Sequence, residues 1–404
     1  MPPLDPRQLI TSLRDHLARH DKPIAFLIGA GASSAVRVDR DGNGLTSLIP
    51  NTTALTGLCQ ESVSALGNNF AAGWDLLVEE CQSLGEDPHI ENLLSRIRLK
   101  FDAIGAGDEL IGLTKDEISQ IDTVIRETIA NAALPNDVPD ELPHHELAKW
   151  IMKASRRLPI EIFTLNYDLL IEKALEDEHL PVFDGFVGSY EPFFYPDSLI
   201  HQDAAPGLNW VRLWKIHGSV NWRYKTNGNQ SRIIRTEPSP AGELILPSLR
   251  KYDESRKQPY VALLDHLARF LEHPDSLLVT VGYSFGDQHV NEIIFEALEH
   301  QGRGHVYALM FEEPDELSDL LLRAQRQPRL VVVGPETGVV GTARGKWRLA
   351  EPVQNTTADM LDLAFDSDAL VPDDVTSVPL TGRMRLGNFI YLSRFLGSLS
   401  LGEA

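Results

Sequence analysis

Cysteine is scarce in this chain of 404 residues, which contains only two, Cys59 and Cys81. Two cysteines cannot form a four-cysteine zinc site, and no Cys-x-x-Cys pair is present. Long apolar runs are lacking too, because no stretch approaches the roughly 18 apolar residues that a membrane span needs. The N-terminus has no apolar signal segment. We therefore expect a soluble, cytoplasmic protein with no bound metal and no membrane contact.

Basic residues are also fewer than acidic ones. The chain has 37 Lys and Arg against 58 Asp and Glu, a formal net charge of -21. This excess of negative charge repels phosphate backbones, and no basic cluster is evident, so we expect no direct nucleic-acid binding. Hydrophobic residues make up 43% and charged residues 24%, ordinary values for a globular protein.

Apolar runs typical of buried strands alternate with helical patterns over much of the chain. Strands are predicted at 24–28, 160–164, 211–216, 277–282, 306–311 and 330–333. Helical patterns occupy 6–20, 167–177, 257–272, 287–299 and 313–325. Strand alternating with helix predicts an α/β fold, with a mostly parallel, Rossmann-like sheet covered on both faces.

The stretch 51–156 is helical in pattern throughout, and we predict a large all-helical insertion there. The Rossmann-like domain is then discontinuous, with segments 1–50 and 157–350. Residues 351–404 form a C-terminal tail, which begins with an acidic, proline-bearing stretch. It ends in an apolar segment, 389–399, that either docks on its own core as a terminal helix or contacts a partner in an assembly.

Four motifs that can carry chemistry follow predicted strands. In the first, Gly29-Ala30-Gly31-Ala32-Ser33-Ser34, glycines let the backbone approach a pyrophosphate at a helix N-terminus. The final glycine or alanine of the dinucleotide fingerprint is Ser34 here, and no acidic residue follows about 20 residues later to hold the adenosine ribose. The loop therefore suggests nucleotide binding but disfavours hydride transfer.

The second motif, Leu165-Asn166-Tyr167-Asp168, follows the strand 160–164, at the position where α/β sheets place ligand groups. Asn166 or Asp168 could instead be a helix N-cap, although capping needs only one of them. The third motif, Lys215-Ile216-His217-Gly218-Ser219, also ends a strand. A lone histidine is more often structural than catalytic. His217 differs in position, because it follows a strand, where α/β sheets place ligand groups. The fourth, Gly282-Tyr283-Ser284-Phe285-Gly286-Asp287, offers Asp287 as a cap or a ribose ligand.

Taken in order, these motifs resemble the sirtuin-like superfamily, and most closely its bacterial NAD hydrolases of antiphage defence. The resemblance covers roughly residues 22–50 and 157–310. It implies NAD as substrate, with Asn166 holding the nicotinamide ribose and the attacking water, His217 as general base and Asp168 steadying the strand end. The residues that the resemblance places along NAD are Gly29, Ala30, Gly31, Ser33, Ser34, Thr164, Asn166, Gly282, Tyr283, Ser284 and Asp287.

The chain departs from the protein-deacylating members of this family in two ways. It lacks their four zinc-binding cysteines, and a charged turn at 39–44 lengthens the loop that leads to Leu48-Ile49-Pro50. Both differences argue against acetyl-lysine chemistry. The expected function is therefore an NAD glycohydrolase that releases nicotinamide and ADP-ribose as a defence effector.

Chain length and domain content most resemble the members paired with a HerA-type ATPase, so we expect a homo-oligomer with such a partner. Two alternatives stay open. One is a non-catalytic sensor of NAD or ADP-ribose, which would need neither Asn166 nor His217. The other is an ADP-ribosyltransferase, which would share every residue named.

Overall fold

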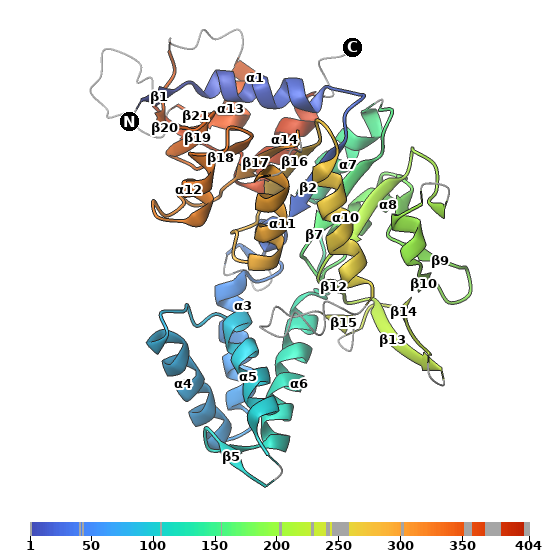
Figure 1. The fold of residues 1–404 in the computed structure, drawn as a ribbon, viewed down its shortest axis with the longest axis vertical. Helices are drawn as coiled ribbons and strands as arrows, with labels where there is room; N and C mark the ends of the chain where they lie inside the picture. The colour runs from blue at the N-terminus through green and yellow to red at the C-terminus, as the bar shows by residue number, and fades with distance from the viewer. Residues whose placement is uncertain are drawn as a thin grey trace.

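A computed structural model shows a sheet-based body from which a helical unit extends (Figure 1). The structure describes residues 2–39, 42, 44–105, 107–154, 156–201, 204–227, 230–239, 243–244, 258–299, 303–350, 358–367 and 381–399. The charged turn expected at 39–44 and the acidic stretch of the tail lie largely outside these ranges.

The body is built on a ten-stranded sheet with strand order β1-β20-β19-β18-β17-β16-β2-β7-β11-β8. Its neighbouring strands are parallel except for the antiparallel pairs β18–β19 and β19–β20. The predicted α/β class and mostly parallel sheet are confirmed. The strands are β1 (Pro3–Leu4), β2 (Ile24–Ile28), β7 (Ile160–Thr164), β8 (Val182–Phe183), β11 (Val211–Lys215), β16 (Leu277–Val281), β17 (His305–Leu309), β18 (Leu330–Val333), β19 (Thr337–Val340) and β20 (Ala343–Trp347).

Both faces of this sheet are buried, which explains why the central strands are continuous apolar runs. In β2, Phe26 points to one core and Leu27 to the other, because successive side chains of a strand alternate. The first core includes helices α1 (Pro6–Leu17), α7 (Pro143–Lys153), α8 (Leu170–Asp177), α13 (Ala358–Ala364) and α14 (Phe389–Leu399). The second includes α10 (Tyr260–Glu272), α11 (Gln288–Glu299) and α12 (Asp319–Ala324).

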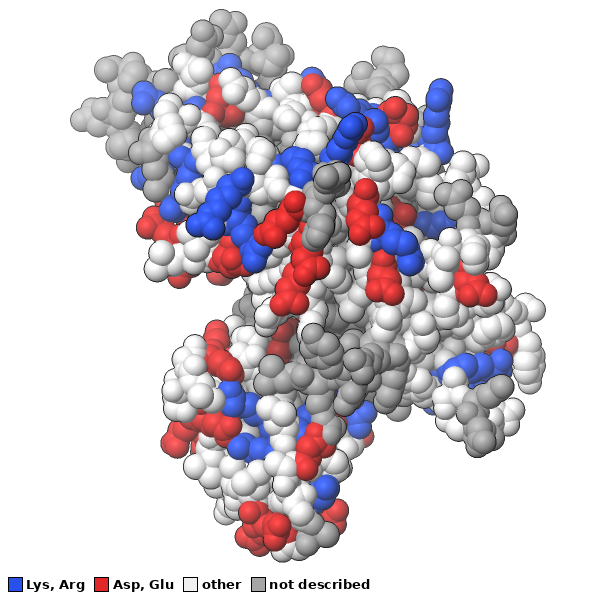
Figure 2. All heavy atoms as spheres, in the orientation of Figure 1, with Lys and Arg blue, Asp and Glu red and all other residues white. Residues whose placement is uncertain are grey.

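The helical unit has a hydrophobic core of its own, in which Trp74, Leu93 and Ile121 are fully buried. Its helices are α3 (Thr52–Ser64), α4 (Asn68–Ser83), α5 (Ile90–Ala103) and α6 (Lys115–Ala132), with a short hairpin of β5 (Glu109–Leu110) and β6 (Leu113–Thr114). Helix α7 falls in the range predicted for the insertion but packs against α14 and the sheet. In Figure 2 the helical unit projects from one end of the body and is narrower than the body.

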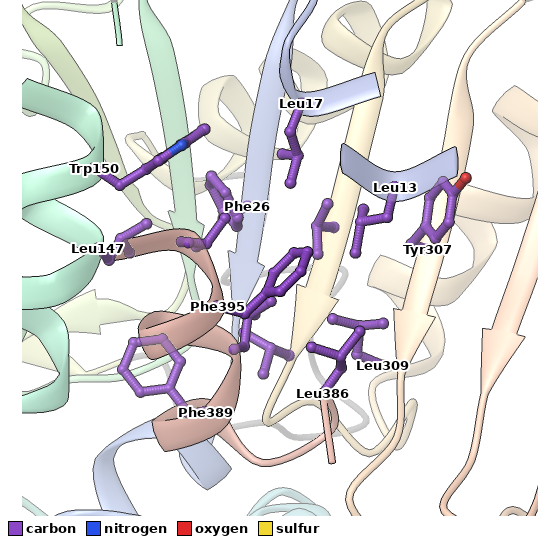
Figure 3. Packing of buried hydrophobic residues seen from close by; sticks show 14 of the residues in the cluster. Leu13, Leu17, Phe26, Leu147, Trp150, Tyr307, Leu309, Leu386, Phe389 and Phe395 are labelled. Carbon is purple, nitrogen blue, oxygen red and sulfur yellow. The ribbon is translucent and has the colours of Figure 1, made fainter. Parts of the chain in front are cut away.

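The C-terminal helix α14 docks on the body's own core. Phe389 and Phe395 are 2% and 0% exposed and lie among residues of β2 and α7, as Figure 3 shows. Of the two roles considered for this segment, docking is the one observed. Its apolar face is therefore not available to a partner in this arrangement.

The remaining elements lie at the periphery of the sheet. A four-stranded sheet has the order β13-β14-β10-β9, and the other pairs are β12–β15, β21–β22 and β3–β4. Their bounds are β3 (Arg37–Val38), β4 (Thr46–Ser47), α2 (Ala30–Ser34), β9 (Phe186–Val187), β10 (Phe193–Phe194), η1 (Pro196–Leu199), β12 (Gly218–Ser219), β13 (Trp222–Asn227), β14 (Gln230–Arg235), β15 (Glu243–Leu244), β21 (Phe365–Asp366) and β22 (Arg383–Met384). Among the described residues, no helix combines the length and apolar character needed to cross a bilayer.

A buried histidine between α7 and α14 makes stability depend on pH. His144 is 2% exposed, its ring lies 4.7 Å from that of Phe389, and neither ring nitrogen has a hydrogen-bond partner among the described residues. Burial lowers its pKa to about 4. The unfolded chain, with an ordinary pKa near about 6.5, therefore takes up a proton first as the pH falls.

We expect the free energy of unfolding to be at its full value above about pH 6.5 and to fall by about 2 kcal/mol between pH 7.5 and pH 5 through this residue. Urea unfolding at the two pH values measures the loss, which His144→Leu should remove. The exposed His20→Gln should keep the wild-type dependence. An equal pH dependence in wild type and His144→Leu contradicts this assignment.

Candidate functional site

The sheet order brings the four motifs together. Strands β16, β2, β7 and β11 are consecutive neighbours and run parallel. Their last residues are in register, with Val281 opposite Ile28, Ile28 opposite Thr164, and Thr164 opposite Lys215. All four motifs therefore leave the sheet at the same level of its carboxyl edge, where α/β proteins bind ligands.

The glycine loops after β2 and β16 touch through their backbones. Gly29 N donates to Val281 O at 3.0 Å and Gly31 N to Gly282 O at 2.9 Å. A Cβ on Gly29 would lie 2.4 Å from Gly282 O, and one on Gly31 would lie 2.7 Å from Gly282 Cα. Gly282 also has φ +63°, a conformation that favours glycine. These glycines are thus required for loop packing, in addition to any approach to a ligand.

Gly31→Ala is expected to lower the free energy of unfolding by about 1–3 kcal/mol, because a backbone-to-backbone clash forces the two loops apart. Chemical denaturation measures the change. Gly57→Ala is the matched control: a Cβ there meets nothing within 4 Å in the middle of α3, so it should be neutral or stabilising. A Gly31→Ala protein as stable as the wild type contradicts the steric argument.

Asn166 is held by a directed chain of hydrogen bonds. Its Nδ2 donates to Gly29 O at 3.1 Å and to Ser33 Oγ at 2.8 Å, and Ser33 Oγ donates to Asp168 Oδ2 at 2.7 Å. The other oxygen of Asp168 accepts from Leu170 N at 3.0 Å, which fixes the turn into α8, although the N-cap position of that helix is Leu169. Because both amide hydrogens of Asn166 are used, its carbonyl Oδ1 is the atom left to meet a ligand.

His217 and Asp287 form a second buried pair, across the sheet edge from β11 to the turn before α11. His217 Nε2 lies 2.9 Å from Asp287 Oδ2, and both residues are 7% exposed. Asp287 Oδ1 accepts from the backbone N–H groups of His289 and Val290, and so caps α11. An ionised carboxylate can only accept, so neutral His217 carries its proton on Nε2 and its lone pair on Nδ1.

The helical unit packs directly on the strand ends that carry these groups. Tyr167, Leu169 and Val220 belong to its core or pack against it, although they follow β7 and β11. The Tyr167 ring lies 6.4 Å from the His217 ring, and burial raises the pKa of its phenol well above the usual value, with the Glu91 carboxylate on α5 adding to the effect. The insertion therefore forms a wall of the candidate site.

A buried ion pair links the end of β11 to α8, next to the candidate site. Lys215 Nζ, 2% exposed at the side chain, donates to Glu172 Oε1 at 2.9 Å and also to the backbone carbonyl of Asp168. Burial raises the pKa of Glu172, and the ammonium of Lys215 opposes that rise. Sequence reasoning missed the roles of Lys215, Glu172 and Tyr167. The only signal was position: Tyr167 and Lys215 lie inside two of the motifs, and Glu172 follows Asp168 by four residues.

The other predicted residues fall into two groups. Ala30, Gly31 and Ser284 are exposed at the carboxyl edge, and Ser34, half-buried, donates to Gly31 O at 3.3 Å. Thr164 and Tyr283 are buried, and their hydroxyls bond to backbone: Thr164 Oγ1 donates to Ile28 O at 3.0 Å, and Tyr283 Oη to Asp287 O at 3.1 Å. These two side chains hold the loops rather than face outward.

Comparison with known proteins identifies one family in this region. Residues 160–328 match the family model described as SIR2-like domain, and no curated protein matches the chain. This match begins at β7 and includes Asn166, His217 and Asp287. The first glycine loop, 29–34, lies outside it.

Three solved structures of Sir2 homologues align with three quarters of the chain. A serine-to-alanine variant bound to ADP-ribose is 15% identical, with 75% of this chain and 86% of that chain covered at a TM-score of 0.32. A complex with NAD is 15% identical, with 75% and 84% covered and a TM-score of 0.31. A histidine-to-asparagine variant bound to ADP-ribose is 14% identical, with 75% and 86% covered and a TM-score of 0.30. Likeness at this level does not define residue-by-residue correspondences.

Proposed function

We propose that this protein is an NAD glycohydrolase that cleaves the nicotinamide–ribose bond. The observation that carries the proposal is that Asn166 and His217 follow neighbouring strands at one edge of the sheet, beside the touching glycine loops. A buried carboxylate supports each of them, Asp168 through Ser33 and Asp287 by direct contact. Such a site can orient a sugar and move a proton. In the described residues no group of His, Cys, Asp or Glu is arranged to hold a metal ion.

In this mechanism, Asn166 orients the reactants. Its Oδ1 accepts a hydrogen bond from a ribose hydroxyl or from the attacking water, while Gly29 and Ser33 prevent the amide from turning. As the C–N bond breaks, its electron pair neutralises the nicotinamide nitrogen, and positive charge develops on the ribose. Orientation of this sugar beside the attacking water is the main contribution that a rigid amide can make.

His217 accepts the proton. Its Nδ1 takes a proton from the attacking water, directly or through a ribose hydroxyl that passes its own proton to His217 and receives the proton of the water, as the new C–O bond forms at the ribose carbon. Nicotinamide leaves as a neutral molecule. The Asp287 carboxylate stabilises the resulting imidazolium at 2.9 Å. Asp168 acts through Ser33 and positions Asn166.

The proposal includes a biological role, namely that of a toxic effector in bacterial antiphage defence, restrained by homo-oligomerisation and by a HerA-type ATPase. The order of the motifs supports this role. Because α14 buries its apolar face in the body, the partner contact is expected elsewhere on the surface. Sizing the protein alone and with a candidate ATPase tests this part; a monomer in both runs refutes it without affecting the proposed reaction.

The reaction is tested with purified protein and NAD, by chromatography of the products. Equal amounts of nicotinamide and free ADP-ribose are expected. Nicotinamide with ADP-ribose attached to protein would identify a transferase instead. NAD binding without nicotinamide release, in the presence of the partner, would identify a sensor and overturn the proposal.

A further inference from the structure

A second polar site lies at the opposite edge of the sheet from the proposed NAD site. A cavity of about 30 Å³ opens there, lined mainly by His16, Arg19, Lys22, Asp275, Ser276 and His305. Leu277 and His305 are the first residues of β16 and β17, which are five residues long. The cavity is therefore roughly 16 Å from the carboxyl edge, and no motif discussed above reaches it.

Ring contacts, hydrogen bonds and close packing hold the residues around the cavity in place. The rings of His16 and His305 lie 5.0 Å apart. His16 Nδ1 bonds to the Tyr307 hydroxyl at 3.0 Å, which leaves Nε2 as the nitrogen able to bind an ion. Backbone bonds hold the rim, with His305 N donating to Ser276 O at 2.7 Å. A Cβ on Gly304 would lie 2.7 Å from Ser276 Oγ, so glycine is needed for this close approach.

Positive charge prevails around the cavity, although the chain as a whole is acidic. Lys22 Nζ is paired with Asp275 Oδ2 at 2.5 Å. In the lining itself, Arg19 and Lys22 are cationic and Asp275 is anionic. Arg303, Arg329 and Asp15 lie outside the lining and act on the same groups electrostatically, so four cations and two carboxylates contribute in all.

Burial and this field both favour the neutral form of the two imidazoles. Burial is the main reason why the pKa of His16 is lowered, and His305 and Arg19 lower it further while Asp15 raises it. Burial likewise lowers the pKa of His305, with Arg329 and Arg19 acting in the same direction and Asp275 in the opposite one. A bound anion would reverse the effect, because it favours the charged form of both rings.

We propose that this cavity binds a small oxyanion of the sulfate or phosphate type, held by Arg19 and by the imidazoles of His16 and His305, each of which takes up a proton from solvent as the ion enters. The volume suits a single ion and excludes a nucleotide. Lys22 and Asp275 form one side of the mouth. This site is independent of the proposed NAD chemistry.

Thermal unfolding of the full chain, titrated with sodium sulfate at pH 6 and pH 8, tests the proposal. Sulfate is a dianion at both pH values, so a pH dependence of binding reports on the protein. We expect saturable stabilisation, with affinity on the order of tenfold higher at pH 6 than at pH 8. Arg19→Gln should weaken binding by about fivefold, and His305→Gln should remove most of the pH dependence.

Arg126→Gln is the control, since this arginine is exposed on α6 of the helical unit and takes no part in the cavity lining. It should bind sulfate as the wild type does. Glycerol 3-phosphate is tested beside inorganic phosphate. Tighter binding of glycerol 3-phosphate identifies an esterified phosphate as the occupant, and tighter binding of inorganic phosphate identifies a free ion. A non-saturable rise shared by all variants is a general salt effect and overturns the proposal, as does equal affinity at both pH values.

Discussion

Asn166→Ala is expected to reduce NAD turnover by about a hundredfold to a thousandfold, while leaving NAD binding measurable. The substitution removes the Oδ1 that orients the ribose or water, and effects of this size follow from losing one preorganised polar group at a reacting centre. Nicotinamide release under saturating NAD measures the turnover, and calorimetry measures the binding.

The same substitution leaves Gly29 O and Ser33 Oγ without their donor, so a loss of about 1–3 kcal/mol in the free energy of unfolding accompanies it. Assays are therefore run well below the melting temperature, with circular dichroism as a check of folding. Asn227→Ala, on an exposed strand remote from the site, is the control and should keep full activity. A folded Asn166→Ala protein with wild-type turnover would refute the proposed reaction mechanism.

Asp287→Asn is expected to lower kcat by about 10²–10⁴-fold with little change in stability. An amide keeps an oxygen for the backbone N–H groups of His289 and Val290, so the cap of α11 survives. Its NH₂ group cannot accept from His217 Nε2–H, and this favours the tautomer with the proton on Nδ1, which cannot act as a base there. Steady-state kinetics over a range of pH, beside a melting curve, measure both quantities.

Two comparisons separate this positioning role from other roles of Asp287. Asp287→Ala removes the cap as well and should cost about 1 kcal/mol of stability in addition to the activity. Asp319→Asn, in the first turn of α12, should change neither. If Asp287 instead bound a ribose, its replacement by Asn would raise KM and leave kcat unchanged, a result that would contradict the pairing with His217.

Much of the site could be predicted because its parts lie at strand ends. Asn166 and His217 each follow an apolar run and precede a turn, a pattern visible in the sequence alone. The partner of His217 could not be predicted in this way. Asp287 lies seventy residues further along the chain, and sequence reasoning left it as a cap or a ribose ligand. It is a cap, and it also holds the histidine.

The packing partners of the helical unit and of the C-terminal helix could not be predicted from the sequence either. A 3.6-residue apolar pattern predicts that α5 and α14 are helices, but not which surface each one covers. Only the structure shows that Tyr167 and Val220 pack into the core of the insertion, and that Phe395 packs against the sheet. The same is true of the cavity at His16 and His305, whose residues are carried by α1 and β17.

The sequence by itself determined the class of fold, the positions of the central strands and the residues offered at their ends, because apolar periodicity and turn chemistry are local properties. The tertiary structure decided which strand ends are neighbours. Chain order runs β2, β7, β11, β16, whereas the sheet order places β16 beside β2. That choice depends on long-range packing of two hydrophobic cores, and it brings the Gly282 loop against Gly31 and Asp287 against His217.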